Sequence, residues 1–343
     1  LIDSFILVYS GDILDGIGWQ ADWVATSLRA VVPVLVLFAV LLIIRPSQLR
    51  TLGSAQSREF VPKPTLMKVL RWGGVMVLAA LALGLWLSNV DALWGTQDLD
   101  DLIRGVGVSI IMLSLVPLTV YGGQISLAQM TFAGIGGVSM AYWGGDNQIL
   151  ALLAGVGIAA VVGALVSLPA LRLRGIYLAL ATMAFAVFME SFVFQELPLL
   201  ASGSARVEPL SIPIFSLESD TATLVFLSVV FVLMSLFVVY LRRSPFGRRL
   251  QAMKDSEAAS ATIGMSLVRT KLSVFALSAG MAGLGGALFY SSIETVGTTD
   301  VAMINSLIVM LMAVVGGIAS VGGVLFGGMA LGVFEIISTH IPA

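Results

Sequence analysis

The chain has 343 residues, of which 58% are hydrophobic and 11% are charged, and its mean hydropathy is +1.01. Because soluble domains carry about 25% charged residues, this chain has too little charge to cover a globular core, which argues against a soluble enzyme and places most of it in lipid. Its 18 Lys and Arg residues against 20 Asp and Glu residues leave no basic excess for nucleic-acid binding, and the absence of cysteine excludes disulfides and thiolate metal sites.

Long apolar segments follow one another along the chain, and a helix that spans lipid needs about 20 such residues. The segments do not alternate between apolar and polar residues, which favours helices over strands. The predicted spans are 27–44, 72–89, 104–121, 128–143, 147–170, 176–196, 221–241, 269–291, 303–317 and a glycine-rich 322–339. The sequence therefore predicts an all-α, polytopic integral membrane protein with about ten transmembrane helices.

The charges between these spans are divided by side of the membrane. Most basic residues lie in the loops 45–71, 171–175 and 242–268. The acids collect in the alternate connections, at Asp91, Asp98, Asp100, Asp101, Glu208, Glu218, Asp220, Glu294 and Asp300. Because basic loops stay in the cytoplasm, the three basic loops are predicted to face the cytoplasm and the acidic connections to face outward.

The two ends of the chain resemble each other, since residues 1–6 and 332–337 both read as an apolar helix that carries one acid. Residues 45–64 are polar and interrupted by prolines, as in a linker. We interpret the chain as the last helices of an upstream unit, a cytoplasmic linker and a second membrane unit, covering 1–50, 51–67 and 68–343. The alternative is a single ordinary polytopic protein.

Polar residues interrupt the apolar pattern between 121 and 129, where two spans meet. Gln124, Ser126 and Gln129 follow the paired glycines Gly122 and Gly123. Polar groups near membrane depth are costly unless they line a cavity or stabilise a helix break, so this segment is a candidate for the wall of a pathway. The alternative is a plain cytoplasmic turn.

The cytoplasmic stretch 244–265 predicts a short surface helix. Pro245 and Gly247 are expected to end the preceding span, alanines favour a helix from about residue 248, and Gly264 is a suitable C-terminal cap. A short helix with a small-residue face suits docking into a groove on a cytoplasmic partner. The alternative is an amphipathic helix that lies on the membrane surface.

Two further features lie within the spans. Glycines crowd the late spans, above all Gly280, Gly283, Gly285 and Gly286, which predicts closely packed helices. Glu190 is an acid in the outer third of its span, so it is either a functional group or a carboxylate that reaches the outer interface. The spans contain no chain of acids and bases, which argues against proton coupling.

Several kinds of chemistry have no motif in this sequence. A Gly-x-x-x-x-Gly-Lys-Ser/Thr phosphate loop is absent, so the chain is not itself an ATPase. No set of histidines and carboxylates has metal-ligand spacing, and the single histidine leaves no nucleophile–histidine arrangement. We therefore expect neither a metal, nor a cofactor, nor a catalytic residue in this chain.

Five stretches together resemble the permeases of branched-chain amino acid ABC transporters, in their M-type subunit. They are GGQISLAQ (122–129), FAGIG (132–136), LRLRGIYLALAT (171–182), SPFGRRLQAMKDS (244–256) and GIASVGGVLFGG (317–328). Residues 1–50, which contain LLIIRPSQL (41–49), resemble the tail of the partner H-type subunit. The whole resembles a fused H–M permease of the bacterial inner membrane with an ABC importer permease fold.

The resemblance implies several partners. Two permease halves form the pathway in lipid, two cytoplasmic ATPase subunits carry ATP and magnesium, and an extracytoplasmic protein binds the substrate. The substrate is expected to be a branched-chain or other hydrophobic amino acid. Alternatives are urea or short amides within the family, or a secondary, ion-coupled transporter.

The resemblance also implies roles for particular residues. Residues 251–264 would be the coupling helix that the ATPase holds, although the glycine of the family's Glu-Ala-Ala…Gly pattern comes one residue late. The residues predicted to couple to the ATPase are Arg248, Arg249, Lys254, Asp255, Glu257, Ala258, Ala259 and Gly264. Those predicted to line the pathway are Gly123, Gln124, Ser126, Gln129, Met183 and Glu190.

Overall fold

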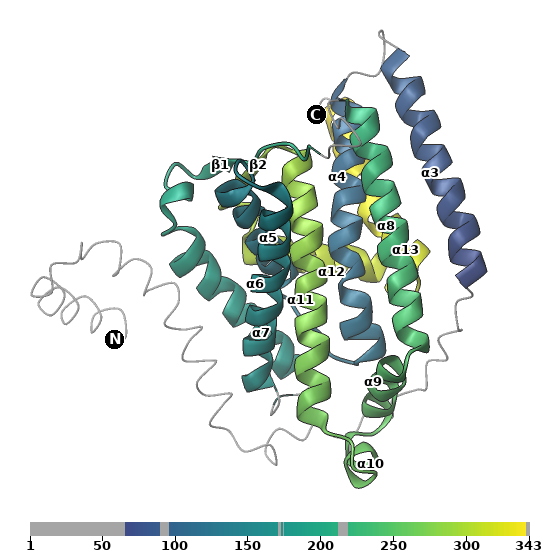
Figure 1. Cartoon of the computed structure of the whole chain (residues 1–343), viewed down its shortest axis with the longest axis vertical. Helices are drawn as coiled ribbons and strands as arrows, with labels where there is room; N and C mark the ends of the chain where they lie inside the picture. The colour runs from purple at the N-terminus through teal and green to yellow at the C-terminus, as the bar shows by residue number, and fades with distance from the viewer. Residues whose placement is uncertain (1–65, 90–95, 171–172, 174, 212–218, 341–343) are drawn as a thin grey trace, which may run out of the picture.

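The computed structural model describes residues 66–89, 96–170, 173, 175–211 and 219–340 (Figure 1). The predicted span 27–44, the upstream unit 1–50, and most of the linker lie outside these residues. The long helices are α3 (Leu66–Asn89), α4 (Thr96–Leu113), α5 (Gln129–Trp143), α6 (Gln148–Ala170), α7 (Ile176–Phe188), α8 (Asp220–Arg243), α11 (Leu267–Ser292), α12 (Met303–Gly316) and α13 (Val321–His340). Two shorter helices, α9 (Pro245–Asp255) and α10 (Glu257–Thr262), lie between α8 and α11.

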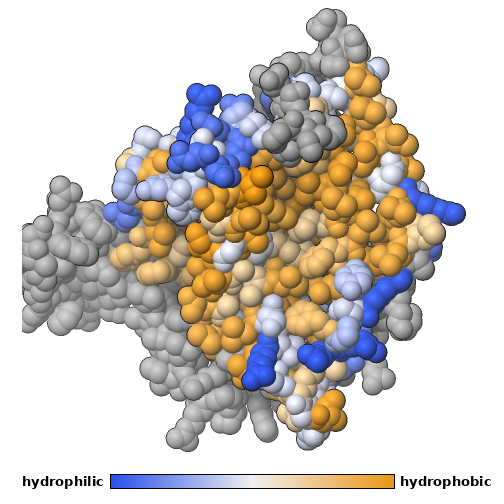
Figure 2. Space-filling model, in the orientation of Figure 1, coloured by the Kyte–Doolittle hydropathy of each residue, from blue (hydrophilic) through white to orange (hydrophobic). Residues whose placement is uncertain are grey.

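The prediction of an all-α polytopic membrane protein is confirmed. Every predicted span after residue 71 coincides with a helix. Among the described residues, six helices are long and apolar enough to cross a membrane, and α12 and residues 321–334 form shorter apolar helices. Figure 2 shows a broad hydrophobic band between a polar end that carries β1 and β2 and a polar end that carries α9. The band is the surface that such a bundle presents to lipid.

Helix α11 runs through the middle of the bundle and packs against α4, α5 and α6 (Figure 1). Its glycines make this approach possible. A Cβ at Gly286 would collide with the Ala133 backbone of α5, and a Cβ at Gly283 would lie 2.7 Å from Cβ of Ala159 in α6. A Cβ at Gly285 would lie 3.1 Å from the Ile111 backbone nitrogen of α4. The predicted close packing of the glycine-rich helices is therefore confirmed for α11.

Two of the helices change pitch before they end. Helix α4 leads through a turn into the π-helix η2 (Val116–Tyr121), and α7 leads directly into the π-helix η3 (Met189–Phe194). Pro117 in η2 has no N–H to donate, which weakens the regular helical ladder. After η2 the backbone leaves the helix until Gln129, and Gly123 has a left-handed φ of 67°. The predicted helix break is confirmed, and we call residues 122–128 the break.

Two short strands tie together the loops at the opposite end from α9. Strand β1 (Ser204–Arg206) pairs antiparallel with β2 (Thr295–Gly297), with Ala205 opposite Val296. The 3₁₀-helix η4 (Pro198–Leu200) precedes β1. The Arg206 guanidinium lies 3.9 Å from the Glu294 carboxylate. This ion pair is exposed and therefore contributes little to stability. The strands therefore join the loop before α8 to the loop before α12.

Candidate functional site

The predicted coupling helix is two helices rather than one. Helix α8 ends at Arg243, directly before the extended Ser244 and Pro245, as predicted for Pro245. Pro245 is also the first residue of α9, and Gly247 lies inside α9 rather than ending α8. The prediction of a single helix from about 248 to 264 is wrong because Ser256, with φ −159°, interrupts it. The Ser256 side chain accepts a hydrogen bond from the Ala259 N–H at 3.2 Å, so it ends α9 and caps α10. We call residues 245–264 the coupling segment.

Gly264 ends the coupling segment as predicted. It has a left-handed φ of 82° and follows the C-terminal cap residue Ile263. Its N–H donates to the Ala261 carbonyl at 3.0 Å, and the Met265 N–H donates to the Ser260 carbonyl at 3.1 Å. This pair of hydrogen bonds is the Schellman arrangement, which favours glycine at its left-handed position.

The coupling segment has an outer and an inner face. It protrudes from one end of the bundle, with α10 at the tip (Figure 1). Leu250, Met253 and Ser260 are buried on the inner face. The exposed predicted coupling residues are Arg248, Arg249, Ala259 and Gly264 on the outer face, and Asp255 and Ala258, which also line the cavity described below. Ile263 is 78% exposed beside them.

Glu257 lies against the bundle rather than on the outer face. Its Oε1 is 2.9 Å from Nζ of Lys271 in α11, and the two side chains are 20% and 5% exposed. A lysine this deeply buried requires a partner, so the ion pair fixes α10 to the first turns of α11.

Lys254 also turns inward, toward the helix break. Its Nζ donates to the carbonyl oxygen of Val120 in η2 at 3.0 Å. A Cβ at Gly123 would lie 2.9 Å from Cγ of Lys254, so the glycine leaves room for the lysine stem. The break and the coupling segment are thus in direct contact, although they are far apart in the sequence.

A cavity of about 500 Å³ lies between the coupling segment and the break, and we call it the coupling-end cavity. It brings together two groups of residues that the sequence singled out separately. Gly123 and Gln124 come from the break, and Lys254, Asp255, Glu257 and Ala258 come from the coupling segment. Gln124 is 6% exposed, and its side-chain oxygen has no hydrogen-bond partner among the described residues.

Ser126 and Gln129 lie deeper in the bundle. Gln129 donates from Nε2 to the Ser278 hydroxyl at 3.0 Å and accepts from the Ser114 hydroxyl at 3.3 Å. The Ser278 hydroxyl in turn donates to the Ser114 carbonyl at 2.7 Å. Ser126 is fully buried and accepts from the Ala128 N–H at 3.4 Å. This polar cluster connects α4, α5 and α11 inside the apolar core.

The polar cluster includes residues that the sequence did not distinguish. Ser114, in the turn after α4, and Ser278, in α11, are isolated serines in apolar surroundings, and no local motif marks them. Thr182 accepts the Leu127 N–H at 2.9 Å, and Ser306 accepts the Met130 N–H at 3.0 Å. Each hydroxyl satisfies a backbone donor that the helix break frees.

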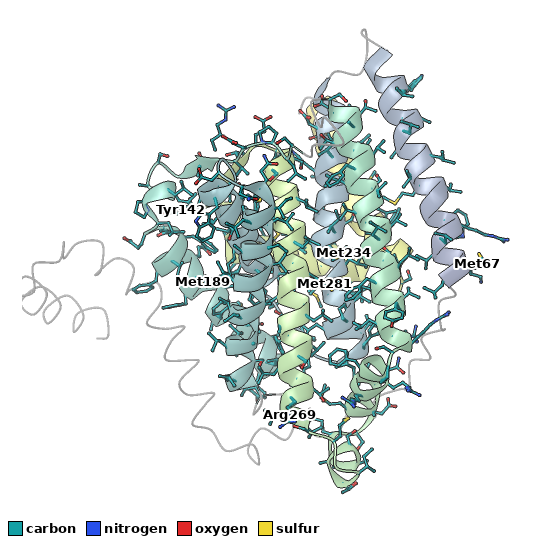
Figure 3. All side chains as sticks on the ribbon, in the orientation of Figure 1. Met67, Tyr142, Met189, Met234, Arg269 and Met281 are labelled. Atoms are coloured by element: carbon teal, nitrogen blue, oxygen red, sulfur yellow. The ribbon has the colours of Figure 1, made fainter. Side chains whose placement is uncertain are left out.

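Met183 and Glu190 lie away from the coupling-end cavity and do not line it. Met183 is half-buried in α7. Oε2 of Glu190 accepts the Met303 N–H at 2.9 Å, at the first residue of α12. A carboxylate at a helix N-terminus is favourable, so Glu190 holds α12 in place. Figure 3 labels Met189, which precedes Glu190 in the chain. It also labels Arg269, which lies at the end of α11 near α10.

The described residues contain no group of three or more His, Asp or Glu side chains that could hold a metal ion. The described helices form a bundle with a polar break and an attached surface segment. Such an arrangement can transmit a mechanical displacement from the surface segment into the bundle.

Comparison with known proteins gives one family. The family described as "Branched-chain amino acid transport system / permease component" matches residues 99–343. The LivM permease protein of the high-affinity branched-chain amino acid transport system is 27% identical in Salmonella typhimurium, over 75% of this chain and 65% of the relative. The LivM protein of Escherichia coli K12 is 27% identical over 93% of this chain and 79% of the relative.

H-type relatives match as well. A probable branched-chain amino acid transport permease protein LivH of Methanocaldococcus jannaschii is 30% identical over 35% of this chain and 38% of the relative. The chain spans just under two thirds of the length of the Salmonella LivM relative. No solved structure matches the chain significantly.

Proposed function

The chain belongs to the branched-chain amino acid transport permease family, and on that premise we propose that it is the pathway subunit of an ATP-binding-cassette importer. Family membership and the six apolar helices found among the described residues make it a multi-pass permease of the inner membrane. The proposed substrates are branched-chain or other hydrophobic amino acids. The relatives are transport subunits, and we assign ATP hydrolysis to separate cytoplasmic subunits.

The observation that best supports this proposal is the coupling segment. Its outer face is exposed, and its inner face contacts two elements of the bundle. The pair Glu257–Lys271 connects it to α11, and the hydrogen bond from Lys254 to Val120 connects it to η2. In the proposed mechanism, partner ATPases bind the outer face and move it, and these two contacts pass the motion to α11 and the break.

Such motion requires that the ATPase states bind the two permease states with different affinities. A partner with equal affinity for both states would shift nothing. We propose that the ATP-bound partners favour one position of the coupling segment and that hydrolysis releases it. The break and α7 then move, so that the pathway opens to the other side of the membrane.

The proposal includes two more partners. A second permease half of the H type completes the pathway, and residues 1–50 are its proposed tail. The matches to H-type relatives support a similarity between H-type and M-type permease subunits. An extracytoplasmic substrate-binding protein delivers the substrate to the outward end of the bundle.

The test is uptake of radiolabelled leucine by cells that contain the complete importer. Ala259→Trp, on the exposed outer face, is expected to abolish uptake and co-purification of the ATPases while membrane insertion persists. Ala201→Trp, exposed at the opposite end, is the matched control and is expected to keep the ATPases bound. Normal uptake by the Ala259→Trp variant would contradict the docking assignment.

Energy coupling is tested in the same cells. Uptake should stop when ATP is depleted and should persist when the ion gradients are collapsed. The opposite result would support a secondary transporter, which needs ion ligands at broken helices near the membrane midplane. Competition by urea or short amides, with no competition by valine or isoleucine, would favour the alternative substrates.

A further inference from the structure

Helix α3 carries two cations on the side that faces away from the bundle. Gly73, Ala80 and Gly84 are its buried residues, and a Cβ at either glycine would collide with a side chain of α8. Lys68 and Arg71 are exposed. At about 100° of rotation per residue, they lie about 140° and 160° around the helix axis from Gly73. Both side chains are therefore on the surface that α3 presents to lipid.

Two close contacts fix the register of α3 against α8. A Cβ at Gly73 would lie 2.7 Å from Cγ1 of Val232, and a Cβ at Gly84 would lie 2.6 Å from Cγ2 of Thr221. Eleven positions separate the two glycines, and eleven separate their two neighbours in α8. The helices therefore run antiparallel without slipping, and the same register can be followed to the start of α3.

This register places the cations beside an apolar part of α8. Arg71 lies level with Met234, and residues 234–241 of α8 are apolar apart from one serine. Arg243, at the end of α8, is about 13 Å further along by helical rise. Figure 1 shows α3 beginning well before α8 reaches α9, and Figure 2 shows hydrophilic side chains at the edge of the hydrophobic band there. Because a lone cation beside hydrocarbon is costly, and a three-methylene stem does not extend that far, Arg71 requires an anion at this depth.

The surroundings of the cations favour an anion that carries an apolar tail. Within the described part of the chain, no carboxylate forms an ion pair with Lys68 or Arg71. Their three- and four-residue spacing continues to Val75 and Leu78, which are 56% and 67% exposed. The stripe thus begins with two cations and continues as apolar surface toward the membrane centre. A phospholipid has the same order of groups, whereas a free anion would leave the apolar part uncovered.

We propose that the start of α3 binds the headgroup of an anionic phospholipid from the leaflet on the α9 side. The phosphate accepts hydrogen bonds from the Arg71 guanidinium and pairs with the Lys68 ammonium, and an acyl chain lies along Val75 and Leu78. Among the described elements, α3 packs mainly against α8, so the lipid gives this helix a second contact. The site requires only that α3 lies in the membrane, and it does not rest on the proposed function.

Trp72 provides the test, because it follows Arg71 and is 73% exposed. The full chain is reconstituted in phosphatidylcholine bilayers that contain brominated phosphatidylglycerol or brominated phosphatidylcholine, whose bromines quench tryptophan fluorescence on contact. The quenching that a Trp72→Phe variant loses belongs to Trp72. Phosphatidylglycerol should bind beside Trp72 at least about fivefold more tightly than phosphatidylcholine. Trp86, exposed near the other end of α3, is the internal control, and the quenching lost in Trp86→Phe should show no such preference.

Variants assign the preference to the two cations. Lys68→Gln combined with Arg71→Gln should abolish the preference for phosphatidylglycerol at Trp72. Arg71→Lys keeps a cation and should retain most of the preference. Arg269→Gln is the matched control, because Arg269 is exposed at the same end of the bundle but belongs to α11 (Figure 3). This control removes a positive charge from that end and should leave the preference at Trp72 unchanged.

Three results would overturn the site. The first is equal quenching of Trp72 by the two lipids. The second is a preference that survives the loss of both cations or is equally strong at Trp86, because it would then come from the general charge of the protein. The third is no quenching of Trp72 by either lipid, which would show that a protein surface covers this side of α3. None of these measurements involves amino acid uptake, so the site and the proposed function can fail separately.

Discussion

Glu257 of α10 and Lys271 of α11 form a 2.9 Å ion pair in which the lysine side chain is only 5% exposed. The family resemblance implies that Glu257 contacts the ATPase. The structure instead places its carboxylate against the chain's own helix, where it balances a buried cation. The outer face is left to the exposed arginines and alanines of the coupling segment. In the proposed function, docking of the partner would therefore fall to the exposed residues, while Glu257 attaches the coupling segment to the bundle.

A charge swap separates these roles. Glu257→Lys and Lys271→Glu, each alone, should lower the free energy of unfolding by about 3 kcal/mol and abolish leucine uptake, because one buried charge loses its partner. The double variant should recover most of both. Thermal unfolding in detergent and leucine uptake are the measurements. If uptake stays absent in a stable double variant, the carboxylate of Glu257 acts on a partner chain.

Gly123 is required by both its conformation and its neighbour. Gly123→Ala should lower the free energy of unfolding by about 1–2 kcal/mol, since its φ is 67° and the new Cβ would lie 2.9 Å from Cγ of Lys254. Gly157→Ala in α6 is the control, because no atom lies within 4 Å of its Cβ position. The control should be neutral or stabilising by up to about 1 kcal/mol. Equal unfolding midpoints for the two variants would refute the assignment.

The glycines of α11 are not equivalent. Gly286→Ala should lower the free energy of unfolding by about 1–3 kcal/mol because its Cβ would collide with the Ala133 backbone. Gly280→Ala, six residues earlier in the same helix, places its Cβ 3.4 Å from Cβ of Ala160 and should be tolerated. Thermal unfolding of the two variants in the same detergent compares them directly. A larger loss for Gly280→Ala would contradict the packing described for α5 and α11.

Glu190 is expected to act through an oxygen rather than through its charge. Glu190→Gln keeps an acceptor for the Met303 N–H and should transport leucine normally. Glu190→Leu removes the acceptor and should lower the free energy of unfolding by about 1 kcal/mol, as the loss of a helix cap does. Uptake and unfolding are measured on both variants. A stable but inactive Glu190→Gln variant would show that the carboxylate charge serves transport.

The helices were largely predictable because apolar length and charge pattern determine them. The break at 122–128 followed from polar residues between two spans, and the ending at Gly264 followed from the freedom of glycine. The π-helices at Val116–Tyr121 and Met189–Phe194 were not predictable, since an apolar stretch does not reveal whether its hydrogen bonds span four residues or five.

The contacts of the site were harder to predict than its segments. Ser256 could lie within a helix or cap one, and only its geometry decides. Lys254 follows Leu250 by four residues and therefore shares the buried face of α9, so the spacing in the sequence carries a signal for its inward position. The hydrogen bond between Gln129 and Ser278 joins residues 149 positions apart. A single sequence contains no signal that two such distant residues are in contact.

The glycine contacts of α11 also have a mechanical meaning. Where backbone touches backbone, no side chains can change rotamer to absorb a displacement, so α11 behaves as a stiff rod against α5 and α6. Lys271 lies near one end of this rod and Tyr290 near the other, about 28 Å apart by helical rise. A tilt of about 5° at the Lys271 end would carry the far end roughly 2.5 Å, beside the strand pair β1–β2. Helix α11 would thus transmit a small displacement at one membrane face to the opposite face.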